Sequence, residues 1–359
     1  MISCILGTRA QLIKMAPVLL ALKNRNIPTE LILTGQHKET MQQLADNFGL
    51  TGNPKYLYTG PEISGIFSMF RWFTKLVARV VMRSPFDKNS QMILVHGDTL
   101  STLLGAVAGK IHRIPVAHIE SGLRSHNIFH PFPEELTRIA VFNLCDIAYC
   151  PGEWAYSNMA KYHINKVNTQ ANTLIDALKI ALDNTKNKPA LDADIRYCVC
   201  SIHRFENIFF KKQLDFIVDQ VIATSKKINV LFVLHPATRK QLIKHNLLSK
   251  LESSNIELLP RMGYIDFINL IRGATFVITD GGGNQEELSY LNIPTILMRK
   301  TTERKEGIGC NVTVSNYDPD LIHSAIDKAC KHTKSSAPAT SCHSPSEAIA
   351  DHIAQRISA

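Results

Sequence analysis

Short apolar runs alternate with stretches of helical spacing along almost the whole sequence. The runs of the first half are residues 2–6, 30–34, 92–95, 115–119 and 146–150, and those of the second half are residues 197–202, 230–234, 276–279 and 294–298. Continuous apolar runs of this length are typical of strands that are buried on both faces of a parallel sheet. The repeated β-α order therefore predicts an α/β fold with two doubly wound sheets.

A chain of 359 residues is long enough for two domains. Residues 184–196 separate the two sets of runs and contain Pro189 and many polar residues, which indicates a linker. We expect an N-terminal domain over residues 1–183, a C-terminal domain over residues 197–335, and a tail over residues 336–359 whose helix could pack back on the N-terminal domain. Ligands of open α/β sheets bind outside the carboxyl ends of the strands, so two sheets predict a site in a shared cleft.

Composition indicates a soluble protein with an anionic ligand. Hydrophobic residues make up 45% and charged residues 20% of the chain, and no apolar stretch of about 18 residues could cross a membrane. The N-terminus lacks the features of a signal peptide, and eight cysteines without a C-x-x-C indicate reduced thiols of a cytoplasmic protein. We expect no disulfide and no metal. The net charge of +9 favours a phosphorylated ligand over nucleic acid, because no nucleic-acid-binding motif is present.

Residues 66–82 form one unusual segment, in which Arg71, Lys75 and Arg79 fall on one helical face. It is either a membrane-surface helix or an amphipathic helix that packs on its own domain or on a second subunit. The packed helix is the favoured interpretation, because such helices are routine in α/β proteins.

Polar residues follow the runs of the first half. Arg9 and Lys14 belong to a Gly-Thr-Arg turn and the helix after it, which is either an anion-binding loop or a plain tight turn. Asp98 follows the run 92–95 and is either directed into the cleft or the N-cap of the next helix.

Two glutamates and two arginines follow the run 115–119. Glu120 and Arg124 stand at the strand end, and Glu134 and Arg138 lie one turn apart on the next helix. The helix macrodipole alone could explain Glu134, but it does not explain Glu120. Together with Asp98, the two glutamates predict a carboxylate cluster that can perform acid–base chemistry.

The second half repeats this arrangement. His203 follows the run 197–202 and is either an acid–base or phosphate-contacting group or a structural histidine; His235 ends the next run in the same manner. Between a strand and a helix, Gly281, Gly282 and Gly283 predict backbone amides that bind a phosphate group.

Two charged residues complete the second-half set. Glu287 lies in the helix after the glycines and can grip ribose hydroxyls, and Arg304 belongs to a loop after the last run.

These stretches resemble the UDP-N-acetylglucosamine 2-epimerase family. The matching pieces, in the order of the family, are GTRAQLIKMAP, TGQHKETM, VHGDTLST, VAHIESGLRS, PFPEELTR, IHRFEN, GYIDFINLI, DGGGNQEEL and MRKTTER. The resemblance implies a fold like that of the two-domain GT-B glycosyltransferases, with two Rossmann-like domains and a nucleotide-binding C-terminal domain. It also implies epimerisation at C2 of a UDP-N-acetylhexosamine without a metal or other cofactor.

In such enzymes a base removes the C2 proton while UDP leaves C1. The resulting 2-acetamidoglucal is protonated from the other face, and UDP adds back. The resemblance makes Asp98, Glu120 and Glu134 the acid–base candidates, without deciding which takes the proton. Arg124 and Arg138 would hold those carboxylates or the sugar.

The resemblance also gives roles to the remaining residues. His203 would assist the departure and return of the diphosphate, while Gly282 and Gly283 meet the phosphates and Glu287 the ribose. The other residues expected to bind substrate are Arg9, Lys14, His235, Gly281 and Arg304. A homodimer and a role in surface polysaccharide precursor synthesis are likewise implied.

Three positions depart from the usual family pattern. Gly281 replaces a serine, so one hydroxyl donor to the diphosphate is missing. Ala10-Gln11 replaces Pro-Glu, and a Gln there resembles relatives that act on modified UDP-sugars, such as diacetamido-uronic acids. A family activator site that binds UDP-N-acetylglucosamine corresponds to Gln36, His37 and Glu39 here, which implies allosteric activation by the substrate.

Four alternatives stay open. One is a 2-epimerase of a modified UDP-sugar, including 6-deoxy sugars, and another is a hydrolysing epimerase that releases UDP and free N-acetylmannosamine. The GTR loop and the IKMAP helix resemble the non-hydrolysing branch more closely. A glycosyltransferase would not need the carboxylate trio, and a UDP-sugar-binding regulator is supported only by the lost serine.

Overall fold

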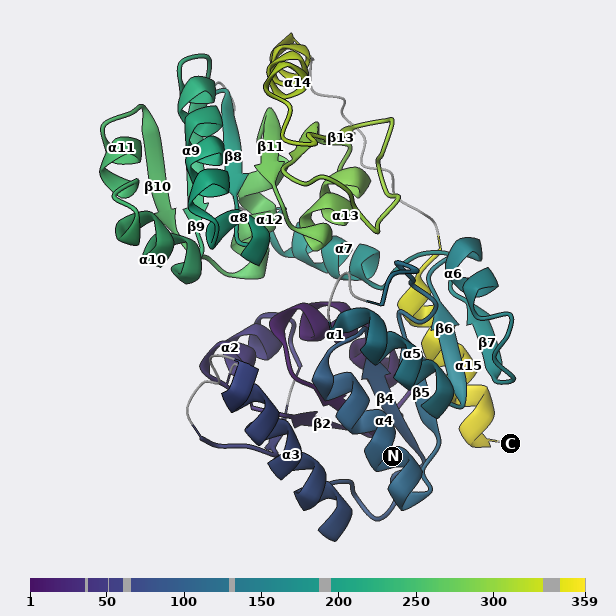
Figure 1. Cartoon of the computed structure of the whole chain (residues 1–359). Helices are drawn as coiled ribbons and strands as arrows, with labels where there is room; N and C mark the ends of the chain where they lie inside the picture. The colour runs from purple at the N-terminus through teal and green to yellow at the C-terminus, as the bar shows by residue number, and fades with distance from the viewer. Residues whose placement is uncertain are drawn as a thin grey trace. The chain divides into compact units, whose positions relative to one another are not determined.

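The computed structural model describes residues 1–35, 38–50, 52–60, 66–128, 133–186, 195–331 and 343–358. The chain divides into two compact units, unit 1 (Met1–Ile180 with Cys342–Ala359) and unit 2 (Ala181–Ser341). Each unit contains one parallel sheet with helices around it (Figure 1). The predicted α/β fold with two Rossmann-like sheets is thereby confirmed. Of the expected linker, residues 187–194 lie outside the described part of the chain.

The sheet of unit 1 has seven parallel strands in the order β3-β2-β1-β4-β5-β6-β7. Its strands are β1 (Ile2–Leu6), β2 (Thr29–Leu33), β3 (Lys55–Tyr56), β4 (Met92–His96), β5 (Val116–Ile119), β6 (Ile147–Cys150) and β7 (Asn165–Asn168). Its helices are α1 (Arg9–Asn24), α2 (Lys38–Asn47), α3 (Ile66–Met82), α4 (Leu100–His112), α5 (Glu134–Leu144), α6 (Glu153–Asn158), most of α7 (Leu174–Asn184) and α15 (Pro345–Ser358). The strand order reverses between β1 and β4, and this is the switch point at which doubly wound sheets bind ligands.

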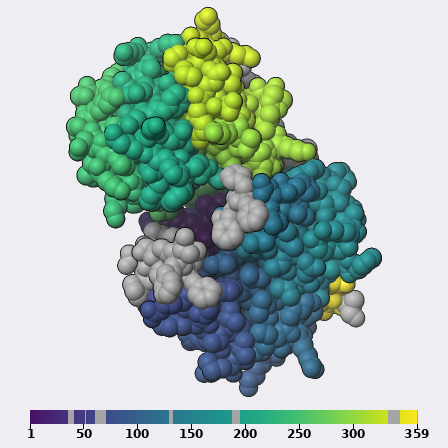
Figure 2. All heavy atoms as spheres, viewed as in Figure 1, coloured from purple at the N-terminus to yellow at the C-terminus, as the bar shows by residue number. Residues whose placement is uncertain are grey.

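The sheet of unit 2 has six parallel strands in the order β10-β9-β8-β11-β12-β13. Its strands are β8 (Tyr197–Ser201), β9 (Asn229–Leu234), β10 (Ile256–Pro260), β11 (Phe276–Thr279), β12 (Thr295–Leu297) and β13 (Val312–Val314). Its helices are α8 (Phe205–Ile208), α9 (Lys211–Ser225), α10 (Pro236–Lys244), α11 (Leu248–Glu252), α12 (Tyr264–Arg272), α13 (Gly282–Tyr290) and α14 (Pro319–Lys331). Its order reverses between β8 and β11. In Figure 2 the atoms of this unit, from green to yellow-green, pack into one continuous body.

Both sheets are buried where the sequence is continuously apolar. Every residue of β1, β4, β5 and β6 is buried in unit 1, as is every residue of β11 and β12 in unit 2. Helices on both faces remove these strands from water, and this burial favours residues without polar side chains.

Helix α3 packs on its own unit, which agrees with the interpretation that the sequence favoured. Trp72, Leu76 and Val80 on one face are buried in the core of unit 1. Arg79 donates from Nη1 to the carbonyl oxygen of Leu57 at 2.6 Å, so it helps to fix the helix. From Trp72 onward, the described apolar face of α3 is therefore covered within its own unit.

The C-terminal helix α15 belongs to unit 1, although it follows unit 2 in the chain. It packs beside α1 (Figure 1), with Ile349 and Ile353 buried. Ser346 donates its backbone N–H to Asp176 Oδ2 at 2.9 Å, and Tyr149 Oη lies 2.9 Å from His352 Nδ1. Unit 1 is therefore made of two segments of the chain, and unit 2 lies between them in the sequence.

The described cysteines carry free thiols, and Cys4, Cys145, Cys150, Cys198 and Cys200 are buried. Burial raises the pKa of the Cys145 and Cys150 thiols to about 12, so they stay protonated and unreactive. Among the described residues, no helix is long and apolar enough to span a membrane.

Candidate active site

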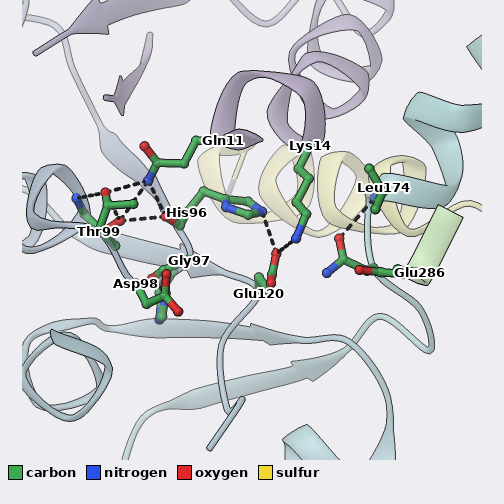
Figure 3. Close-up of polar contacts among 12 residues, drawn as sticks. Gln11, Lys14, His96, Gly97, Asp98, Thr99, Glu120, Leu174 and Glu286 are labelled. Carbon is green, nitrogen blue, oxygen red and sulfur yellow. Dashed lines mark hydrogen bonds and ion pairs between the residues drawn. The ribbon is translucent and has the colours of Figure 1, made fainter. Parts of the chain in front are cut away.

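The loops after β1 and β4 lie side by side at the switch point of unit 1, because these two strands pair. Gln11 joins them (Figure 3). Its Oε1 accepts from the backbone N–H of Gly7 at 2.8 Å and of Thr8 at 3.1 Å. Its Nε2 donates to the carbonyl oxygen of His96 at 2.6 Å and to Thr99 Oγ1 at 3.0 Å. The buried amide thus holds the two loops together.

Glu120 directly follows β5, and its carboxylate contacts the side chains of Lys14 and His96. Lys14 Nζ lies 2.5 Å and His96 Nε2 lies 3.2 Å from Glu120 Oε2 (Figure 3). Burial lowers the pKa of His96, so its ring is neutral at neutral pH. The side chains of Lys14, His96 and Glu120 are all less than one-tenth exposed.

The backbone of Glu120 adopts φ +64°, a left-handed conformation that is costly for a residue with a side chain. Such strain persists only where surrounding contacts hold it, and it is concentrated at functional sites. The conformation directs the Glu120 carboxylate to Lys14 on α1 and His96 on β4.

A second ionic network begins at Asp98. Arg138 donates from Nη2 to Asp98 Oδ2 at 2.6 Å and from Nη1 to Glu135 Oε2 at 3.2 Å. Arg124 donates from Nε to Glu135 Oε1 at 2.5 Å, and the backbone N–H of Ser125 donates to Glu135 Oε2. Burial raises the pKa of Glu135, but these hydrogen bonds outweigh it and hold the pKa below its ordinary value.

Glu135 was not predicted from the sequence, although it stands next to Glu134. It faces the unit and is fully buried, whereas Glu134 is half-buried on the first turn of α5. Arg124 contacts Glu135, not one of the three predicted carboxylates. The sequence did contain one indication of this role. Glu135 lies three residues before Arg138, and residues at this spacing meet on one helix face.

Glu134 differs from the other acidic residues of this edge. Its Oε2 is buried and has no hydrogen-bond partner among the described residues. A buried carboxylate oxygen is normally satisfied, since leaving it without a partner costs about 1–3 kcal/mol or more. This oxygen can therefore accept a hydrogen bond that the described residues do not supply.

His118 supports the loop after β4 and was also missed. Its Nε2 lies 2.8 Å from the carbonyl oxygen of Gly97, and its ring packs against Phe142. Burial lowers the pKa of His118 to about 4, so the ring is neutral and donates to that carbonyl. The Gly97 turn, at φ +67°, presents Asp98.

The switch point of unit 2 is organised by Asp280, which is fully buried at the end of β11. Its Oδ2 accepts from the backbone N–H of Arg204 at 2.9 Å and from Asn207 Nδ2 at 2.9 Å. The backbone N–H of His203 donates to both carboxylate oxygens at 3.1 Å, and His203 Nδ1 lies 3.3 Å from Oδ1. Asp280 therefore fixes the predicted His203 loop against the glycine loop.

The three glycines form the start of α13. Gly281 is the N-cap and has no side chain to cap the helix, and Gly282 and Gly283 are its first two residues. A Cβ at Gly282 would lie 3.2 Å from Arg304 Nε, and one at Gly283 would meet nothing within 4 Å. The first amides of a helix have no acceptor within it, so this end of α13 can receive a phosphate group.

The other predicted residues of unit 2 have partners within the protein. Arg304 pairs from Nη1 with Glu286, and Glu287 is buried in α13. His235 caps α10 by accepting from the backbone N–H of Ala237, and its ring centroid lies 6.0 Å from that of His203.

Four of the predicted residues remain. Arg9 is half-buried at the start of α1. Gln36 and His37 lie outside the described residues, as does the side chain of Glu39 on α2.

A cavity of about 540 Å³ opens in unit 1 at the amino end of β2, lined by residues such as Lys23, Glu30 and Lys55. None of the predicted site residues lines it. The charged clusters described above stand at the opposite, carboxyl ends of the strands, where α/β sheets hold ligands.

The family model described as UDP-N-acetylglucosamine 2-epimerase matches residues 20–354. The chain belongs to the UDP-N-acetylglucosamine 2-epimerase family. A UDP-N-acetylglucosamine 2-epimerase of Methanocaldococcus jannaschii is 34% identical over 340 residues, which cover 89% of this chain and 90% of that relative. The chain is therefore an enzyme of the epimerase class.

Two crystal structures of family members are similar to this structure. Each match covers 99% of this chain and 99% of the matched chain. That of the Neisseria meningitidis UDP-GlcNAc 2-epimerase bound to UDP-GlcNAc gives a TM-score of 0.85 at 26% identity. That of the Methanocaldococcus jannaschii enzyme in complex with UDP-GlcNAc and UDP gives a TM-score of 0.85 at 28% identity. The GT-B-like fold implied by the resemblance is confirmed by these matches.

Proposed function

We propose that this epimerase interconverts UDP-N-acetylglucosamine and UDP-N-acetylmannosamine by inverting C2 of the sugar. The observation that carries the proposal is the Glu120 cluster, in which a strained, buried carboxylate is held by Lys14 and His96. The relatives named above are described as UDP-N-acetylglucosamine 2-epimerases, and two of their structures contain UDP-GlcNAc.

Inversion requires that a proton leaves one face of C2 and that another arrives at the opposite face. Unit 1 carries three carboxylates that could move these protons, namely Glu120, Asp98 beside Arg138, and Glu134 with its unpartnered oxygen. Carboxylates in such different surroundings can take different protonation states, which acid–base catalysis on two faces needs.

The C2 proton is only weakly acidic, so its removal must accompany cleavage of the C1–O bond to UDP. The electron pair of that bond passes to the β-phosphate oxygen and leaves a 2-acetamidoglucal. The amides of Gly282 and Gly283, with Arg304 and His203, are the donors of unit 2 that would stabilise this charge. Glu287 would bind the ribose. Return of UDP to C1 with protonation of C2 completes the epimerisation.

Proton NMR of the purified protein with UDP-N-acetylglucosamine in D2O tests the reaction. We expect UDP-N-acetylmannosamine with deuterium at C2, and loss of both signals in Glu120→Gln. Glu252→Gln, a matched change at an exposed position of α11, is expected to retain both. Free N-acetylmannosamine with UDP would instead show a hydrolysing epimerase.

A lack of deuterium at C2 in the wild-type protein would overturn the proposed substrate. UDP-sugars with 3-acetamido, uronic acid or 6-deoxy groups would then be assayed in the same way. The buried, fully engaged amide of Gln11 offers no contact that favours such a sugar.

We also propose a homodimer that acts in the cytoplasm, as expected of the family. The described apolar residues Trp72, Leu76 and Val80 of α3 are covered within their own unit, so they do not support a dimer. Light scattering after size-exclusion chromatography gives the mass of the particle in solution, and a monomer mass near 40.1 kDa would contradict the dimer.

A further inference from the structure

Asp280 touches His203 through both the backbone and the ring. The backbone N–H of His203 lies 3.1 Å from each carboxylate oxygen, and Nδ1 lies 3.3 Å from Oδ1. The Asp280 side chain is fully buried, while that of His203 is 42% exposed. A buried carboxylate that contacts an exposed ring resembles the acid that orients a histidine in hydrolase active sites.

We propose that Asp280 is a positioning residue that turns Nδ1 of His203 toward itself and leaves Nε2 available to the leaving UDP. This inference rests on the proposed function of His203. The two nitrogens lie on opposite sides of the ring, so a ring held at Nδ1 presents Nε2 away from Asp280. The neutral ring then carries its proton on Nδ1, and the positively charged ring carries a second proton on Nε2.

Gly281 makes room for this ring position. A Cβ at residue 281 would lie 3.0 Å from His203 Cε1, closer than nearly all such contacts in proteins. The backbone of Gly281 has φ −77°, which any residue can adopt, so a side chain at this position would be limited by the space beside the His203 ring and not by backbone conformation. Asp280 thus contacts the ring at Nδ1, and Gly281, the next residue, leaves space beside the adjacent Cε1.

The consequence for the reaction concerns charge. When the C1–O bond breaks, its electron pair moves to the β-phosphate oxygen. A ring that has already taken a second proton from water donates a hydrogen bond from Nε2–H to that oxygen. The Asp280 carboxylate keeps its contact with Nδ1 while UDP leaves and while it returns. Without Asp280, the ring is free to take the other tautomer or to turn away.

Asp280 could instead serve only to brace the turn after β8, because Arg204 and Asn207 also donate to it. A variant of Tyr317 can distinguish the two roles. The Tyr317 hydroxyl donates to Asn207 Oδ1 at 2.8 Å, and Asn207 in turn donates to Asp280, so Tyr317 is hydrogen-bonded to Asp280 only through Asn207. Tyr317→Phe loosens the network around the turn while it leaves the contact between Asp280 and His203 in place.

The test combines NMR of the ring with steady-state kinetics. Protein labelled with ¹⁵N-histidine is recorded without substrate, and His203 is assigned with His203→Gln. In the wild-type protein and in Tyr317→Phe we expect the neutral ring of His203 to carry its proton on Nδ1. In Asp280→Asn we expect the proton on Nε2, with kcat lowered on the order of 10²-fold and KM nearly unchanged.

Gly281→Ala provides a second route to the same answer, should Asp280→Asn fail to fold. It displaces the ring and keeps the carboxylate, so we expect kcat to fall about tenfold with a mixed tautomer signal. An unchanged Nδ1–H tautomer in both variants would overturn the positioning role. The spectra are recorded without substrate, so they test the position of the His203 ring even if the protein is inactive on UDP-N-acetylglucosamine. Inactivity on that substrate would contradict the proposed function alone.

Discussion

Lys14 and Glu120 form a buried ion pair, in which each charge is stabilised mainly by its partner. Their side chains are 9% and 7% exposed, and the third member of the cluster, His96, is neutral. Removal of Lys14 would leave the Glu120 charge buried without a cation. Loss of one partner of a buried pair typically costs about 3–5 kcal/mol, whereas loss of an exposed pair costs little.

We therefore expect Lys14→Met to lower the free energy of unfolding by about 3 kcal/mol in urea denaturation. The double variant with Glu120→Gln is expected to regain part of this loss, because no charge is then left alone. Lys186→Met, which removes the exposed pair with Asp183, serves as the control and is expected to leave stability nearly unchanged. Equal stability of Lys14→Met and the wild type would contradict the pair.

His118 makes the stability of the protein depend on pH. Its pKa is about 4 in the folded protein because of burial, against an ordinary value of 6.5 in the unfolded chain. Below pH 6.5 the unfolded chain binds a proton that the folded protein does not, so the free energy of unfolding falls as the pH falls. The loss is complete near pH 4 and amounts to a few kcal/mol.

Urea denaturation at pH 7, 6 and 5 measures this effect. We expect the wild type to lose stability steadily over that range, with His96 acting in the same direction because its pKa is also lowered by burial. His118→Gln keeps a side-chain donor for the Gly97 carbonyl and is expected to show a flatter dependence. An equally steep loss in His118→Gln would assign the acid sensitivity to other groups.

Among the elements, the sequence predicted the interior strands and missed the edges. β3, β7, β10 and β13 are the four outermost strands of the two sheets, and none was predicted. An edge strand has a neighbour on one side only, is shorter or half-exposed, and so lacks a continuous apolar run. β7, with the sequence NKVN and no buried residue, shows the reason plainly.

The site was predictable to a similar extent. Polar residues after interior strands, such as Asp98, Glu120 and His203, were found because their strands were found. Residues that contact them from inside, such as Asp280 and Glu135, were not named, because the sequence does not show which neighbour in a motif faces inward. Distant partners, such as Gln11 with His96, are set by strand order.

Helix α15 stabilises unit 1 through buried aliphatic side chains, although exposed ion pairs also reach it. Ile353 is fully buried, whereas Arg25 pairs with Asp351 and Glu347 at the surface, where such pairs contribute little. We expect Ile353→Ala to lower the free energy of unfolding by about 3 kcal/mol. Leu321→Ala on the exposed side of α14 is the control. Urea denaturation followed by circular dichroism compares the two, and equal effects would mean that α15 is not anchored by its apolar face.

At the scale of the whole molecule, the two units differ in how the chain forms them. Unit 2 is one continuous segment, Ala181–Ser341, while unit 1 is completed by the helix that follows it. Within unit 2, Arg272 donates from Nη2 to the carbonyl oxygen of Thr185, the residue after α7, at 2.9 Å. Unit 2 has its own buried core, built on β8, β9, β11 and the helices that cover them.

We expect a fragment of residues 181–341 to fold alone, with a single cooperative urea transition. A fragment of residues 1–180 is expected to be less stable and to bind an apolar dye, because the surface that receives Ile349 and Ile353 is uncovered. Joining residues 343–359 to that fragment through a flexible linker restores the missing helix and is expected to remove dye binding. The same joined fragment with Ile353→Ala controls for the linker itself. A stable 1–180 fragment that binds no dye would show that α15 is dispensable for unit 1, and that the return of the chain serves some purpose other than closing its core.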